Sequence, residues 1–146
     1  MTLWDAAHLS ATAADTALLW LTQLLIYPQF FCVSKESFPE YHRLHMRRMM
    51  APVGVIYLAE GLTAAVVTWR ALPSAPVLSL VTAVLFLAQV ALTFLWFVPC
   101  HQRLAEGASP ELLRRLLSGN WSRVGLESAR LALVIASTID AVSAPS

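Results

Sequence analysis

The chain has 146 residues, of which 58% are hydrophobic and 13% are charged. The charged fraction is about half of that in ordinary soluble domains. This composition excludes a typical water-soluble fold and predicts one integral membrane domain, residues 1–146, whose main partner is the lipid bilayer. The net charge is only +1, so the basic excess needed for binding nucleic acid is missing and we expect no nucleic-acid partner.

Four stretches are apolar and long enough to cross the hydrocarbon core, which takes about 20 helical residues. They are residues 14–33, 49–69, 76–98 and 121–142. The fourth stretch contains Arg123, Glu127, Arg130 and Asp140. It is retained because a helix surrounded by three others can turn its charged side chains toward the bundle interior. We therefore expect an all-α fold, a four-helix transmembrane bundle.

Basic residues are distributed unequally between the two ends of such a bundle. With four crossings both termini lie on one side, and most basic residues fall on or near the other: Lys35, Arg43, Arg47, Arg48, Arg103, Arg114, Arg115 and Arg123. Short loops rich in Lys and Arg remain in the cytoplasm. The sequence thus predicts a multi-pass inner-membrane protein with both termini on the outer side.

Local signals predict where two of the cytoplasmic elements begin and end. Ser37-Phe-Pro-Glu40 matches a capping box with a first-turn proline, so the second helix is expected to begin near Phe38. Pro52 lies inside this long helix and should kink it. Residues 111–117, between the third and fourth spans, are expected to form a short amphipathic helix that ends at Gly119.

Two residues of opposite charge lie near the middle of their spans. Glu60 and Arg130 are each about ten residues from both ends of a span, where an unpaired charge is costly. We therefore expect a buried ion pair between them. In one interpretation this pair only holds the second and fourth helices together. In the other, Glu60 is part of a proton or cation path.

A second polar group is expected near the cytoplasmic face. At about 100° per residue, His42 and His45 point into the bundle, and His101 ends the third helix at the same level. Three histidines without a thiolate suit Fe, Cu or Zn, and one of them would suit haem. The same level gathers candidate ligand-binding side chains for an oxygenated or quinone-like molecule: Tyr41, Asn120, Arg123 and Glu127. Alternatively, the histidines are interfacial and only hydrogen-bonded to these neighbours.

Four short motifs stand out along the chain: Tyr27-Pro-Gln-Phe30, Phe38-Pro-Glu-Tyr-His42-x-x-His45, Pro99-Cys-His101 and Asn120-Trp-Ser-Arg123. In these motifs, and over nearly its whole length, the chain resembles an uncharacterised family of small bacterial four-span integral membrane proteins. That family is distantly similar to anthrone-oxygenase-like membrane proteins. The resemblance implies a four-helix bundle in a bacterial inner membrane and suggests oxidoreductase-type chemistry with a bound cofactor.

Three functions remain open on these residues. The first is a membrane enzyme or redox-associated protein that holds a metal, haem or quinone-like ligand at His42, His45 and His101. The second is a non-catalytic subunit of a membrane complex, or a homo-oligomer, in which the polar side chains serve packing. The third is a proton or small-solute carrier, which needs a polar path from Glu60 to the outer face.

Overall fold

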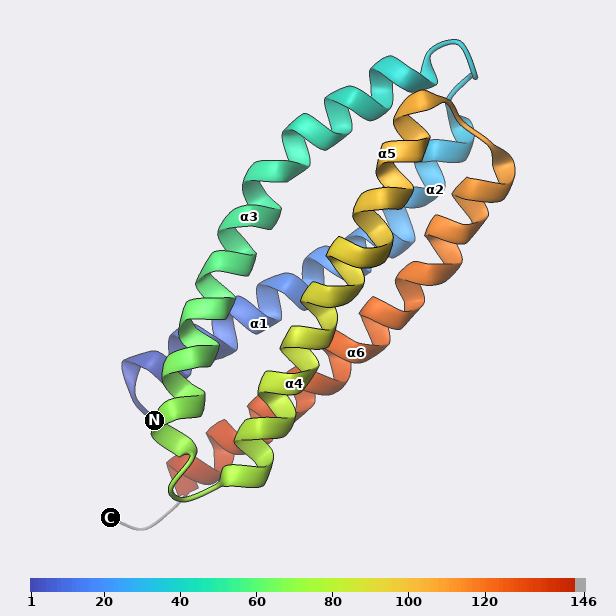
Figure 1. Cartoon of the computed structure of the whole chain (residues 1–146). Coiled ribbons are helices and arrows are strands. Elements are labelled where there is room, and N and C mark those ends of the chain that lie inside the picture. The colour runs from blue at the N-terminus through green and yellow to red at the C-terminus, as the bar shows by residue number, and fades with distance from the viewer. Residues whose placement is uncertain (144–146) are drawn as a thin grey trace.

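The computed structural model describes residues 1–143. All of the regular structure within these residues is helical, and four long helical segments run side by side in an elongated bundle (Figure 1). The all-helical fold is therefore confirmed. Three segments are long and apolar enough to cross a membrane: Leu3–Cys32, Phe38–Ala71 and Pro76–Glu106.

The first segment begins well before the predicted span. Helix α1 (Leu3–Leu21) is capped by Thr2, which forms a capping box with Asp5. It continues through a π-helical turn (Thr22–Ile26), α2 (Tyr27–Gln29) and a 3-10 turn (Phe30–Cys32). The early start adds about three helical turns, which carry buried His8 and Thr12, to the bundle.

Helix α3 (Phe38–Ala71) begins at the predicted residue, and Pro52 lies inside it. Figure 1 shows that this helix is bent. The predicted capping box at its start is wrong, because among the described residues the Ser37 side chain bonds to no helix N–H group. Ser37 has helical backbone angles instead of the extended ones that an N-cap needs. Its own N–H group donates to the Ser34 hydroxyl at 3.3 Å.

The third segment consists of α4 (Pro76–Leu92), a π-helical turn (Thr93–Phe97) and α5 (Val98–Glu106). Its π turn, like the one in the first segment, directly precedes a proline-containing helix start: Pro28 follows Thr22–Ile26 and Pro99 follows Thr93–Phe97. Proline has no N–H group to donate to the preceding turn. A π turn adds one residue to that turn and rotates the residues that follow, among them Tyr27 and His101.

The fourth segment is a single helix, α6 (Pro110–Ser143). The predicted separate helix over residues 111–117 is wrong, since α6 continues through Gly119 without a break. Buried Leu113 and Leu116 lie on the same face as buried Asn120 and Arg123, so one inward stripe runs along the helix. Gly119 serves close packing instead of ending a helix, because a Cβ atom there would lie 3.1 Å from Nε1 of Trp96.

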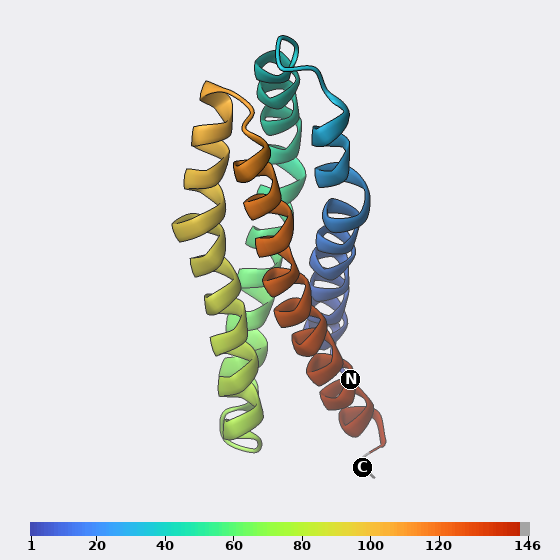
Figure 2. The same cartoon turned by 90° about the vertical axis from the view of Figure 1, so that its right-hand side faces the viewer.

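The two ends of the bundle differ in what they carry. The start of α1, the end of α6 and the turn at residues 72–75 lie at one end, which we call the terminal end (Figure 1, Figure 2). The connections at residues 33–37 and 107–109 lie at the other, which we call the loop end. Exposed basic side chains such as Lys35, Arg43 and Arg114 belong to the loop end.

The bundle is apolar outside and polar inside. Large hydrophobic side chains such as Leu58, Trp69 and Leu95 are 65%, 77% and 79% exposed. By contrast, the charged side chains of Glu60 and Arg130 are both 0% exposed. Such an apolar surface is suited to contact with lipid tails rather than with water. The burial pattern therefore agrees with the membrane character that the composition predicts.

Candidate functional site

Buried polar side chains gather at two levels of the bundle. The histidine layer lies toward the loop end and contains Tyr27, His42, His45 and His101. The charged layer lies deeper and contains Thr12, Asp15, Glu60, Glu127 and Arg130. All of these residues except His45 are buried.

A chain of hydrogen bonds runs through the histidine layer. The Tyr27 hydroxyl lies 3.1 Å from Nε2 of His101, and Nδ1 of His101 lies 3.0 Å from Nε2 of His42. The three side chains come from α2, α5 and α3. Nδ1 of His42, at the end of the chain, is buried and has no hydrogen-bond partner within residues 1–143. The layer therefore ends in one free imidazole nitrogen.

Aromatic side chains hold these imidazoles in place. The Phe38 ring stacks on His42 with the centroids 5.6 Å apart and the planes 17° apart. Phe30 meets His42 edge-on at 5.9 Å and His45 at 5.0 Å. Phe30 and Phe38 belong to the apolar cluster that also contains Leu104 and other side chains of the loop end. Rings packed in this way keep few alternative rotamers, so the His42 and His45 side chains are preorganised.

His45 belongs to this layer but lies outside the hydrogen-bonded chain. Its ring centroid is 6.3 Å from that of His42 and 6.0 Å from that of His101. In the described part of the chain, the three histidines do not form a group whose ligand atoms all lie within 4.8 Å of one another. The geometry thus favours a hydrogen-bonded histidine pair over the expected three-histidine metal site.

A pocket of about 720 Å³ opens beside the histidine pair, between α3 and α5. We call it the loop-end pocket. Its walls are Pro39, His42, Arg43, Met46, Val98 and His101, together with a few neighbours. Glu40 and Arg43 lie at its rim and form an exposed salt bridge at 3.6 Å. Apolar walls with a few polar groups are typical of sites for small organic molecules.

Two of the four predicted ligand-binding residues link helices elsewhere. Asn120 donates to Oε1 of Gln23 at 3.0 Å. Arg123 donates to the Tyr57 hydroxyl at 2.9 Å, and its guanidinium group lies 4.6 Å from the Phe97 ring centroid. Neither side chain lines the loop-end pocket, within the residues that the structure describes. Both instead tie α6 to neighbouring helices.

The other two predicted ligand-binding residues also lie away from the pocket. The Tyr41 ring packs edge-on against Phe30, with the centroids 5.9 Å apart. Glu127 lies in the charged layer, three residues before Arg130 on the same face of α6, and not beside the histidines. The expected single pocket that unites these four residues with the histidines is therefore not what the structure shows.

Arg130 is the centre of the charged layer. It forms a salt bridge with Glu60 of α3. Its Nη2 and Nε atoms also donate to Glu127 at 2.7 and 3.1 Å, and Nη2 lies 3.2 Å from the Thr12 hydroxyl of α1. The structure thus brings Glu60 and Arg130 together, as part of a network that joins three helices.

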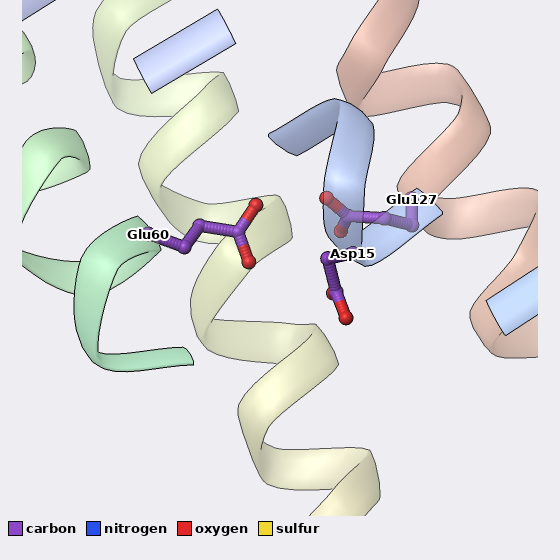
Figure 3. Close-up of side chains that lie close together, drawn as sticks. All are labelled: Asp15, Glu60 and Glu127. Carbon is purple, nitrogen blue, oxygen red and sulfur yellow. The ribbon is translucent and has the colours of Figure 1, made fainter. Parts of the chain in front are cut away.

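Sequence reasoning did not identify Asp15 as a member of this layer. The carboxyl groups of Asp15, Glu60 and Glu127 each offer an oxygen within 4.8 Å of the others, and Figure 3 shows Glu60 and Glu127 pointing toward each other. Asp15 is 0% exposed, and neither of its oxygens has a hydrogen-bond partner among residues 1–143. The signal in the sequence was the spacing of Thr12 and Asp15, which places both side chains on one face of a helix.

The polar interior continues from the charged layer to the terminal end. Nδ1 of buried His8 lies 3.1 Å from the Thr63 hydroxyl, one turn beyond Glu60 on α3. His8 also lines a cavity of about 330 Å³, which we call the terminal-end cavity. Its other polar walls include Asp5, Ser79, Thr82, Thr138 and Asp140. A first span that begins at residue 14 leaves His8 and Thr12 outside the bundle, so the sequence did not predict them here.

Comparisons with protein-family models, with curated proteins and with solved structures find no match for this chain. The resemblance to small bacterial four-span proteins therefore stays a prediction. The function has to be argued from the geometry of the two layers.

Proposed function

We propose that this chain is a four-span protein of a bacterial inner membrane, with both termini outside, which binds a quinone-like small molecule in the loop-end pocket. Support for a fourth crossing comes from α6, whose Arg123, Glu127 and Arg130 side chains are buried while Ile139 and Val142 are 58% and 63% exposed. A helix with this distribution can lie among lipids without exposing charge. The basic loop end faces the cytoplasm in this arrangement.

The observation that carries the ligand proposal is the free Nδ1 atom of His42 at the end of the Tyr27–His101–His42 chain. A neutral imidazole has one protonated nitrogen and one bare nitrogen. The chain can therefore run in two directions. When the Tyr27 hydroxyl donates to His101, Nδ1 of His42 carries a proton and donates. When the Tyr27 hydroxyl accepts, Nδ1 of His42 is bare and accepts.

A quinone-like molecule can form a hydrogen bond with Nδ1 of His42 in both directions of the hydrogen-bonded chain. Its oxidised form offers a carbonyl oxygen that accepts a hydrogen bond, and its reduced form offers a hydroxyl that donates one. The pair His42 and His101 can serve both forms by reversing its hydrogen bonds, with no charge placed in the layer. The apolar walls of the pocket, among them Met46 and Val98, suit the ring. Arg43 at the rim pairs with Glu40 through Nη2, and its other N–H groups can donate to a second oxygen.

Binding of a short-chain ubiquinone to the protein in lipid nanodiscs tests the proposal. We expect H42A and H101A to weaken binding by about tenfold, since one hydrogen bond contributes about 1 kcal/mol or slightly more. Y27F should weaken binding less, because it removes only the hydroxyl at the far end of the chain and leaves the bond between His101 and His42. The matched control is H45A, which should bind ubiquinone like the unchanged protein because His45 takes no part in the hydrogen bonds that join Tyr27, His101 and His42.

The same variants separate this proposal from the metal or haem site that the sequence predicts. A three-histidine centre would need His45 as much as His42. If the purified protein contains a stoichiometric transition metal or shows a Soret band, and H45A loses it together with H42A, the metal or haem site replaces the quinone proposal. Absence of any ubiquinone binding would also contradict it.

A further inference from the structure

We infer that the charged layer is a proton-binding site, in which Asp15 holds one exchangeable proton that reaches it from the terminal end. This inference concerns a different part of the bundle and does not rest on the quinone proposal. It is supported by the balance of charges in the layer, the hydrogen-bond state of Asp15 and the placement of His8.

The charges that face the layer do not balance unless a proton is added. In the described part of the chain, the carboxyl groups are Asp15 from α1, Glu60 from α3 and Glu127 from α6. The guanidinium groups are Arg130, and Arg123, which is buried one turn before Glu127 on the same face of α6. Helix α4 contributes the uncharged Gln89. Arginine stays protonated in proteins, so three ionised carboxyl groups would leave one uncompensated negative charge. Such a charge is costly at this depth.

Asp15 is the carboxyl group best placed to take the proton. Glu60 and Glu127 are both held by Arg130. In contrast, within residues 1–143 Asp15 forms no salt bridge, and neither of its oxygens has a hydrogen-bond partner. Gln89 lies beside Asp15, is 0% exposed, and also has no partner for its amide nitrogen or its carbonyl oxygen among these residues. A protonated Asp15 can donate to the Gln89 carbonyl oxygen, whereas an ionised Asp15 would stay buried with few donors.

The path to Asp15 starts in the terminal-end cavity. His8 lines this cavity and is buried, and its Nδ1 atom lies 3.1 Å from the Thr63 hydroxyl. His8, Thr12 and Asp15 lie four and three residues apart, so they occupy successive turns on one face of α1. The Thr12 hydroxyl accepts from Arg130. Imidazole takes up and releases protons readily, so His8 is the residue that passes a proton between the cavity and the layer.

Infrared spectroscopy of the protein in nanodiscs, followed against pH, tests this inference. A buried protonated carboxyl group gives a carbonyl band separate from that of ionised carboxylates. We expect one such band per chain in the unchanged protein and its loss in D15N. The matched control is E40Q, which removes an exposed carboxyl group at the loop end and should keep the band. H8L should keep the band but slow its response to a pH jump.

D15N should fold, because asparagine has the same shape and the remaining two carboxyl groups balance the two guanidinium groups. We expect its melting temperature at alkaline pH to be no lower than that of the unchanged protein. Persistence of the band in D15N would overturn the inference, and so would its absence from the unchanged protein at every pH. Loss of the band when sodium replaces choline at constant pH would overturn it in favour of a metal cation. Y27F should keep the band and D15N should keep ubiquinone binding, so failures of the two proposals are distinguishable.

Discussion

The guanidinium group of Arg130 contacts side chains from three helices: Thr12 of α1, Glu60 of α3 and Glu127 of α6. In a bilayer, few other cations are available to the carboxylates of such a layer. Removing one partner of a buried ion pair leaves an uncompensated charge, which is more destabilising than the loss of an exposed pair. The stability of the bundle should therefore depend more on Arg130 than on either glutamate alone.

We expect R130M to lower the free energy of unfolding in detergent micelles by about 3–5 kcal/mol. E60Q should cost less, because Arg130 keeps its bonds to Glu127 and Thr12. Thermal or denaturant unfolding measures both changes, with E40Q as the control for loss of an exposed carboxyl group. An R130M variant as stable as E40Q would contradict the network.

The double variant E60R/R130E gives a further check at the scale of single residues. In an isolated pair, exchanging the two charges restores much of the attraction. In this network, however, a glutamate at position 130 would face Glu127 three residues earlier on the same helix face, where like charges repel. We therefore expect unfolding measurements to show no recovery over R130M.

Depth alone made the Glu60–Arg130 pair predictable from the sequence, because both residues lie in the middle of predicted spans. Asp15 was not predictable in the same way. A span that begins near residue 14 places Asp15 at a membrane boundary, where a charge is common and needs no partner. Only the observed start of α1 at Leu3 moves Asp15 into the interior of the bundle.

Helix α6 shows how packing can reverse the meaning of a local signal. A glycine after an amphipathic stretch is typical of a helix end, yet Gly119 lies inside a helix of 34 residues. Buried Leu113 and Leu116 before it and buried Asn120 and Arg123 after it form one inward stripe. The close approach of the Trp96 ring to Gly119 explains why a side chain is missing at this position.

Two glycines of α6 allow this interpretation to be tested. G125A should stabilise the protein by about 0.5–1 kcal/mol through helix propensity, because among the described residues nothing lies within 4 Å of a Cβ atom at Gly125. G119A should gain less, since Trp96 must shift, and G119L should lose stability. Unfolding measurements in micelles give the relative stabilities of G125A, G119A and G119L. Equal gains for G119A and G125A would show that the contact with Trp96 has no energetic weight.

At the scale of the whole molecule, both ends of the chain lie at the terminal end while the basic residues gather at the loop end (Figure 2). Cys32 is exposed at the loop end, and Cys100 is buried. Ser74 is exposed in the turn between α3 and α4. A cysteine at position 32 or 74 can therefore be labelled to find the side of the membrane on which the loop end and the terminal end lie.

A membrane-impermeant maleimide should label S74C in intact spheroplasts, whereas Cys32 should react only after lysis. Each site is measured in a background without the other cysteines. S143C, at the end of α6, should react like S74C if α6 crosses the membrane. Labelling of S143C together with Cys32 would show that α6 does not cross, and labelling of Cys32 in intact cells would reverse the orientation.

The sequence by itself determined the class of the protein. Long apolar stretches, few charges and an uneven distribution of basic residues are required by the lipid environment of the helices. Each of these features can be recognised in one segment without knowing the others. Only the tertiary structure decided which polar groups meet. Tyr27 and His101 each follow a π turn in their own segment, and their side chains meet. Asp15, Glu60 and Glu127 converge from three helices. These contacts depend on the rotation and depth of each helix against its neighbours, and those are set by packing over the whole bundle.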